Sequence, residues 1–285
     1  MLKINYLFLS LLCFIVMSCS TNGEEQKKRV AVTILPQKYL LDKIVGDSLE
    51  VICVIPDGAN PEEYAAMPNL MKEIAISSLY FKVGELGFER TTLPSIIKNI
   101  PEIKVVTLSE GVEMMSSECS HGGEKHNHYD PHYWTSPKMV KIMAKNMCES
   151  IMEFDKKNSS YYQLNYLKLV EELDSVDLKI ETILSKSTNR QFAIFHPSLS
   201  YFARDYGLQQ LSLEQNGKSM APRTMQQAID EAVAAGVKTV FIQNEFNPEQ
   251  VNTFAKEIGA SVVVINPLAY DFIEEIKKVA YAIAE

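Results

Sequence analysis

Short apolar runs alternate with helical patterns along most of this chain, and the alternation occurs twice. In the first half the expected strands are residues 30–36, 49–56, 78–84 and 103–108. In the second half they are residues 192–197, 208–214, 237–243 and 261–267. The segments between them have helical spacing, and several begin with proline, which the first turn of a helix accepts. This order is typical of parallel sheets covered by helices, so two α/β lobes are predicted.

A long segment without glycine or proline separates the two halves, from Asn158 to Arg190. Polar residues that can cap a helix stand at its start. Its apolar residues recur mostly at intervals of three, as on one face of a helix: Leu164, Leu167, Val170, Leu173, Val176, Leu178, Ile180 and Ile183. About 28 helical residues would make a rod of about 42 Å. We therefore expect one rigid helix over residues 158–188, which joins an N-terminal lobe (30–157) to a C-terminal lobe (189–285).

The N-terminus reads as a secretion signal. Residues 1–18 contain one lysine followed by an apolar stretch that is too short for a stable membrane span. The Ser18-Cys19 pair resembles a bacterial lipobox, in which Cys19 becomes the lipidated first residue. Residues 19–29 would then be a flexible tether. Cleavage at another position, as in an ordinary signal peptide, is the alternative. An extracytoplasmic, lipid-anchored protein on the periplasmic side of a bacterial membrane is expected.

The charge balance argues against a nucleic-acid partner. Removal of residues 1–18 takes away Lys3 and no acidic residue, so the net charge falls from −8 to −9. Nucleic-acid binding requires basic patches, which this balance disfavours.

Five histidines are concentrated in two places. Four lie between positions 121 and 132, and the fifth, His196, ends a strand candidate. Neutral imidazole is the commonest protein ligand for transition metals, zinc above all. A polar loop can also carry histidines that only face solvent. A lone histidine at a strand end can equally be a core residue.

Three segments place a potential metal ligand beside proline and aromatic residues. They are NPEEY (60–64), DPHYW (130–134) and FHPSLSYF (195–202). Their candidate ligands Glu62, His132 and His196 are 70 and 64 residues apart, too far for a zinc finger or a helical H-E-x-x-H site. They can meet only if the lobes face each other across a cleft, at the carboxyl ends of the strands.

With these segments, the chain resembles the zinc/manganese solute-binding lipoproteins of bacterial ABC transporters over nearly all of residues 29–285. The matching segments are DGANPEEYAAMPNLMKEI, DPHYWTSPKMV, FHPSLSYFARDYGL, APRTMQQAIDEAVAAGVKTVFIQNEFNP and INPL. The resemblance implies two α/β lobes joined by a long helix, with a metal bound between them and little movement on release. It also implies a monomer that delivers its metal to a permease in the inner membrane.

The family's usual site has three histidines and a carboxylate or water, and the resemblance implies an altered site here. Glu62 stands where the first histidine is usual, and His132 and His196 match the second and third ligands. Asn266 stands where an aspartate is usual. The candidates for a substitute fourth ligand are a water, Glu63, Glu245 and Asp271.

Zinc is the expected metal, because it accepts a set of one glutamate and two histidines. Manganese and ferrous iron tolerate more oxygen ligands and are the alternatives. Asp130 and Tyr64 are expected to support the ligands from outside, with Asp130 orienting His132. Trp134 would leave an extended segment on the same face as His132.

The loop over residues 118–129 resembles the histidine-rich acidic loop of zinc-specific members. Its histidines, His121, His126 and His128, would collect metal at low affinity. An incidental surface loop is the alternative.

A metal receptor, which is not an enzyme, is therefore the expected function. One alternative is a secreted zinc hydrolase with Glu63 as the base, although no recognised motif places a base or nucleophile. A divergent member with altered or lost metal binding is the other, because function depends on sites rather than folds.

Overall fold

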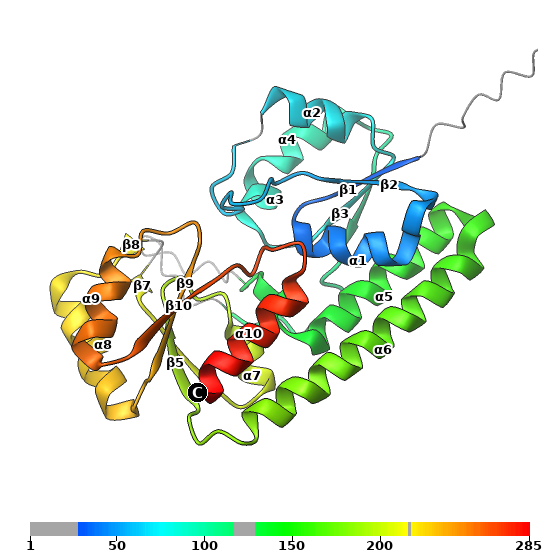
Figure 1. Ribbon diagram of the computed structural model, residues 1–285. Coiled ribbons are helices and arrows are strands. Elements are labelled where there is room, and N and C mark those ends of the chain that lie inside the picture. Colours follow the sequence, from blue (N-terminus) through cyan, green and yellow to red (C-terminus); the bar gives the residue numbers. More distant parts are fainter. Residues whose placement is uncertain (1–27, 66, 117–128, 216–217) are drawn as a thin grey trace, which may run out of the picture.

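Two four-stranded parallel sheets organise the molecule (Figure 1). The computed structural model describes residues 28–65, 67–116, 129–215 and 218–285. The first sheet has the order β2-β1-β3-β4, with β1 Arg29–Val32, β2 Glu50–Cys53, β3 Leu79–Lys82 and β4 Lys104–Thr107. The second has the order β10-β9-β5-β6, with β5 Gln191–Ile194, β6 Gln209–Ser212, β9 Thr239–Gln243 and β10 Ser261–Ile265. The prediction of two parallel-sheet α/β lobes is confirmed.

Each expected strand is present, but all eight are shorter than the apolar runs that predicted them. β1 ends at Val32 because Ile34 caps helix α1 (Leu35–Val45), whose first turn contains Pro36. The end of the apolar run therefore belongs to a helix start, where proline's fixed φ is favourable. This early end leaves the carboxyl ends of the strands free to carry polar loops.

Helices cover both sheets (Figure 1). In the first lobe they are α1, α2 Pro68–Ala75, α3 Gly87–Thr91, α4 Leu93–Ile97 and α5 Pro137–Phe154. The second lobe has α7 Ser200–Asp205, α8 Pro222–Ala235, α9 Glu249–Ile258 and α10 Phe272–Ala284. Two short strands, β7 Glu214–Gln215 and β8 Lys218–Ser219, form a small antiparallel pair.

The long helix α6, Ser159–Leu184, has 26 residues and runs beside α5 (Figure 1). It contacts α1 of the first lobe and α10 of the second. Its buried residues are Tyr162, Leu169, Leu173, Val176, Ile180 and Leu184. The predicted face was partly wrong, since Leu164, Leu167 and Leu178 are 53%, 49% and 66% exposed. Repeated steps of three residues drift around a helix with 3.6 residues per turn, so they do not stay on one face.

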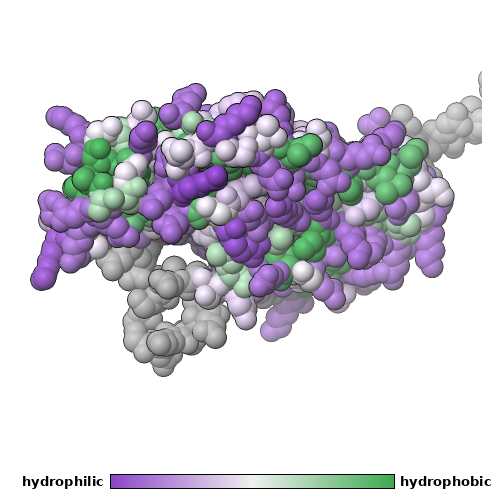
Figure 2. Space-filling model, turned by 90° about the horizontal axis from the view of Figure 1, so that it is seen from below, coloured by the Kyte–Doolittle hydropathy of each residue, from purple (hydrophilic) through white to green (hydrophobic). Residues whose placement is uncertain are grey.

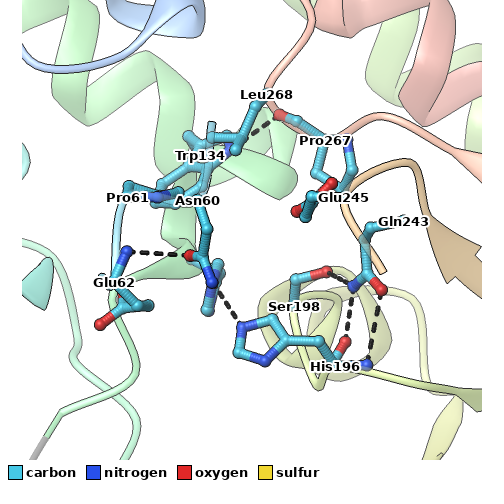
Figure 3. A pocket seen from close by; sticks show the side chains of 11 residues that line it. Asn60, Pro61, Glu62, Trp134, His196, Ser198, Gln243, Glu245, Pro267 and Leu268 are labelled. Atoms are coloured by element: carbon cyan, nitrogen blue, oxygen red, sulfur yellow. Dashed lines mark hydrogen bonds between the residues drawn. The ribbon is translucent and has the colours of Figure 1, made fainter. Parts of the chain in front are cut away.

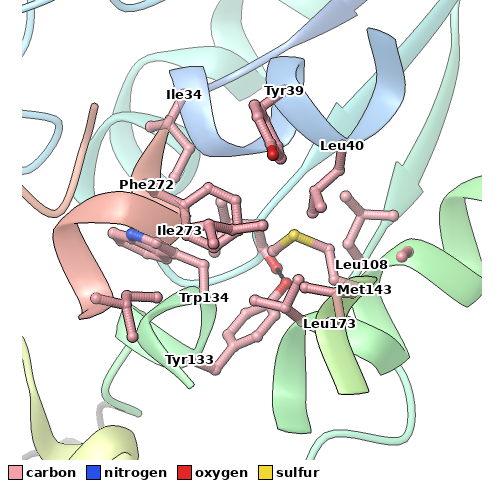
Figure 4. Close-up of a cluster of buried hydrophobic side chains, with 14 of the residues drawn as sticks. Ile34, Tyr39, Leu40, Leu108, Tyr133, Trp134, Met143, Leu173, Phe272 and Ile273 are labelled. Atoms are coloured by element: carbon pink, nitrogen blue, oxygen red, sulfur yellow. Dashed lines mark hydrogen bonds between the residues drawn. The ribbon is translucent and has the colours of Figure 1, made fainter. Parts of the chain in front are cut away.

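One hydrophobic cluster extends across both lobes (Figure 4). Tyr39 of α1 meets Tyr270 and Phe272 of the second lobe edge-on, at 5.4 and 5.6 Å between ring centroids. The Tyr270 hydroxyl donates to Asp42 at 2.8 Å. Because a hinge motion would expose this apolar surface to water, the contact favours a fixed arrangement of the lobes.

Among the described residues, no helix has the length and apolarity to span a membrane. The predicted signal, Cys19 and most of the predicted tether lie outside the described residues. The face of the molecule in Figure 2 is mostly hydrophilic, with small separate apolar areas, as is normal for the surface of a globular protein.

Candidate metal centre

A small cavity of about 20 Å³ lies where loops from both lobes meet (Figure 3). This volume holds about one water molecule or ion, and it is far too small for an organic ligand. Its lining residues are Asn60, Pro61, Glu62, His132, Trp134, His196, Ser198, Gln243, Glu245, Pro267 and Leu268.

Two histidines from different lobes meet in this cavity. The Nε2 atoms of His132 and His196 are 3.3 Å apart, and the ring centroids are 5.0 Å apart. Two nitrogens that each bind a tetrahedral zinc at roughly 2.0–2.1 Å stand about 3.3–3.4 Å from each other. The separation therefore fits a single zinc ion shared by both imidazoles.

Asp130 orients the ring of His132. Its Oδ1 atom lies 2.7 Å from His132 Nδ1 and accepts the His132 backbone N–H at 2.9 Å. Burial lowers the pKa of His132, but the charge of Asp130, this hydrogen bond and the charges of Glu62 and Glu214 together outweigh burial and leave that pKa raised. With the ring proton held on Nδ1, the lone pair of Nε2 points into the cavity, as in metal sites with a carboxylate behind the histidine.

Glu214 has the same role for His196, with Oε2 at 2.7 Å from His196 Nδ1. Glu214 was not among the site residues predicted from the sequence. Strands β5 and β6 pair in parallel with Ile194 opposite Ser212, so two residues further along His196 comes beside Glu214. An acidic residue at the end of the next predicted strand was the available signal. The Phe246 ring stacks on the His196 ring, with 5.6 Å between the ring centroids.

Gln243, at the end of β9, fixes the backbone of the His196 segment. Its Nε2 atom donates to the His196 carbonyl at 2.7 Å and to Ser198 Oγ at 2.8 Å, as Figure 3 shows. The segment is thereby held against the second sheet before any ion arrives.

Glu62 approaches the cavity from the first lobe. Its backbone N–H donates to Asn60 Oδ1 at 2.9 Å, and its Oε2 atom accepts the Gly87 N–H at 3.0 Å. The other carboxylate oxygen, Oε1, is buried and receives no hydrogen bond from the described residues. A buried anionic oxygen without a partner is costly, and a cation in the cavity would supply that partner.

Glu245 follows β9 and also lines the cavity. Burial raises the pKa of its carboxyl, and its own backbone N–H together with the neighbouring His196 and His132 offset this rise only in part. Its negative charge is therefore electrostatically coupled to both imidazoles.

The other proposed fourth ligands are placed differently. Glu63 and Asp271 are exposed, and neither lines the cavity. The side chain of Asn266 accepts from Leu268 N at 3.1 Å and donates to Asp57 at 3.5 Å. In this segment, Pro267 and Leu268 line the cavity and Asn266 does not.

Tyr64 packs on Phe88, with 6.0 Å between the ring centroids, and is not part of the cavity lining. The loop histidines His121, His126 and His128 lie outside the described residues. At the base of that loop, Ser116 and Tyr129 form an antiparallel bridge.

The expected extended segment at Trp134 was wrong, because residues His132–Thr135 form a 3-10 turn. Two hydrogen bonds stabilise that turn. The His132 N–H donates to the Asp130 carboxylate, and the Thr135 hydroxyl donates to the His132 carbonyl. The Trp134 ring nevertheless lies 5.1 Å from the His132 ring, and its N–H donates to Pro267 at 3.0 Å.

Across the described residues, no three His, Cys, Asp or Glu side chains stand close enough together to hold a metal ion. The two imidazoles are in place. A metal bound between them would need a third ligand, either a lining carboxylate in another rotamer or a water molecule.

Comparison with known proteins identifies the family. The model of the family described as "ZnuA: Zinc-uptake complex component A periplasmic" matches residues 30–285. The chain belongs to the ZnuA family. Members of the ZnuA family are periplasmic metal-binding receptors for ABC uptake systems. They are solute-binding transport proteins rather than enzymes.

Individual relatives cover nearly the whole chain. The "High-affinity zinc uptake system protein ZnuA" of Bacillus subtilis (strain 168) is 27% identical over 281 residues, which are 92% of this chain and 88% of that protein. A crystal structure of ZnuA has a TM-score of 0.84 and 31% identity, and covers 90% of this chain and 98% of its own. A zinc-bound deletion mutant of ZnuA has the same TM-score and identity, and the match covers 90% of this chain and 97% of that one. The predicted resemblance is confirmed.

Proposed function

We propose that this protein captures one zinc ion between His132 and His196 and delivers it to an ABC permease. The observation that supports this most strongly is the 3.3 Å distance between the two Nε2 atoms, which matches the edge of a zinc tetrahedron. The proposed lipid anchor at Cys19 would keep the receptor near the permease. Capture by a monomer is sufficient, since both lobes contribute a histidine.

Glu62 and Glu245 would complete the site. Glu62 offers the buried oxygen that has no hydrogen-bond donor, and Glu245 lies on the side of the second lobe. With two carboxylates, the charge of a divalent ion is neutralised in a cavity that excludes most water. Two nitrogens favour zinc, whereas Mn²⁺ and Fe²⁺ are favoured by sites richer in oxygen.

Metal analysis with competition titration tests the proposal. Purified mature protein should hold about one equivalent of Zn²⁺ in a strong site. Displacement of zinc by an equal concentration of Mn²⁺ or Fe²⁺ would show that zinc is not the cargo. A protein that binds none of the three would exclude the receptor function.

Replacing Glu245 by glutamine should weaken Zn²⁺ binding about tenfold and Mn²⁺ binding by more than that. Loss of a charged oxygen ligand penalises the harder ion most. Exposed Glu63 is the matched control, and Glu63→Gln should leave both affinities unchanged. An unaltered zinc-to-manganese ratio in Glu245→Gln would assign the fourth position to water.

Replacing Glu214 by glutamine should weaken zinc binding by about 10–100-fold, the usual cost of losing a carboxylate behind a ligating histidine. The amide can donate to Nδ1 as well as accept from it, so the ring proton is no longer held on Nδ1. Exposed Glu249, in the same lobe, provides the control variant Glu249→Gln. Equal zinc affinity in the two variants would contradict a role for Glu214 at His196.

A further inference from the structure

A buried glutamate outside the lining of the metal cavity stands in the first lobe. Glu89 is 4% exposed and lies on the short helix α3. Its Oε1 atom accepts the Val83 N–H at 2.7 Å and the Thr33 hydroxyl, and its Oε2 atom accepts the Gly84 N–H at 2.6 Å. Thr33 directly follows β1, and Val83 and Gly84 follow β3. One carboxylate thus fixes the ends of the two central strands.

The helix that carries Glu89 also holds the loop of Glu62. The Gly87 N–H donates to the Glu62 carboxylate at 3.0 Å, and the Phe88 N–H donates to the Pro61 carbonyl at 3.0 Å. A Cβ atom on Gly87 would lie 2.3 Å from the Glu62 carbonyl oxygen. The helix and the loop are therefore in direct backbone contact, and a shift of α3 must move Glu62.

Glu89 is connected to the segment that carries His132 through one peptide group and the Tyr133 side chain. The N–H of the Val83–Gly84 peptide donates to Glu89, and the carbonyl of the same peptide accepts the Tyr133 hydroxyl at 2.9 Å. Tyr133 is fully buried and directly follows His132. Hydrogen bonds in such a series polarise one another and strengthen. The segment that carries His132 is thus anchored to the same carboxylate as Glu62.

We propose that Glu89 is a positioning residue that sets the place of Glu62 relative to His132, and that its loss loosens the first-lobe half of the metal site. This inference rests on the proposed zinc function. Burial raises the pKa of Glu89 to about 7, which reflects the cost of keeping a carboxylate in this place. An apolar side chain would avoid that cost, but it could not join two strand ends to a ligand-bearing helix.

The test compares Glu89→Gln with Ile96→Val. Ile96 is 3% exposed and belongs to the same hydrophobic cluster as Phe88, so its variant perturbs the lobe without touching the hydrogen bonds. Glu89→Gln should weaken zinc binding about tenfold, within the range for supporting residues of metal sites, while Ile96→Val binds zinc as the unchanged protein does. In a Glu62→Gln background, Glu89→Gln should reduce the zinc affinity by less, because part of the effect of Glu89 on zinc binding acts through Glu62.

Amide hydrogen exchange in the metal-free protein gives a readout that does not need zinc. Glu89→Gln should speed exchange at Gly84 and Gly87, and Ile96→Val should not. Unchanged zinc affinity in Glu89→Gln, or exchange at both glycines as slow as in Ile96→Val, overturns the proposal. If the unchanged protein binds no zinc, the proposed function fails, and the exchange rates alone decide whether Glu89 holds the helix and loop together.

Discussion

Zinc affinity should fall by about a hundredfold to a thousandfold when either His132 or His196 is replaced by alanine. Strong protein zinc sites are worth roughly 10–16 kcal/mol, so an equal share for each of four ligands is about 2.5–4 kcal/mol. Both imidazoles belong to the part of the site that is already assembled, with 3.3 Å between their Nε2 atoms.

Competition with a chromophoric chelator measures this loss. Glu63→Gln is a suitable control, since Glu63 is exposed and does not line the cavity. Denaturant unfolding of each metal-free variant separates loss of a ligand from loss of the fold. Zinc binding of normal strength in both histidine variants would remove these residues from the site.

Glu89 should make the metal-free protein less stable as the pH rises from about 4.5 to about 8. Burial raises its pKa in the folded protein from 4.5 to about 7. The folded state therefore holds the proton more tightly than the unfolded chain. The resulting stabilisation is complete below pH 4.5 and is lost as the pH rises through 7, roughly 3 kcal/mol in all.

Urea unfolding at a series of pH values, with Glu89→Gln as the reference, isolates this contribution. His132 also titrates with a raised pKa, but it is present in both proteins and largely cancels in the difference. The free energy of unfolding of the unchanged protein, relative to that of Glu89→Gln, should decline between about pH 4.5 and about pH 8. A difference that is flat between pH 4.5 and 8 would show that Glu89 keeps an ordinary pKa.

The strands and the two histidines could be predicted because their signals are local. Apolar runs of strand length, such as the one that became β9, need no knowledge of the partner strand. His132 and His196 stand beside proline and aromatic residues in a chain with few histidines. Their convergence also required two facing lobes, which the strand and helix order implied.

The supporting residues could not be predicted in the same way. Glu214 becomes a neighbour of His196 only through the register of β5 and β6. Glu89 lies on a five-residue helix, which is too short to show a periodic pattern. Its partners directly follow two strands, β1 and β3, that are far apart in sequence. The exposed Leu164 and Leu178 show a further limit, since apolar spacing alone did not identify which face of α6 meets the lobes.

The hydrophobic cluster shared by the two lobes has a consequence for how the protein unfolds. Tyr39 on one side and Tyr270 and Phe272 on the other belong to a single apolar contact, so neither lobe can melt without exposing the surface of its neighbour. The lobes should therefore behave as one cooperative unit. An ion bound at the cavity then stabilises the whole molecule by mass action, including helices that are remote from it.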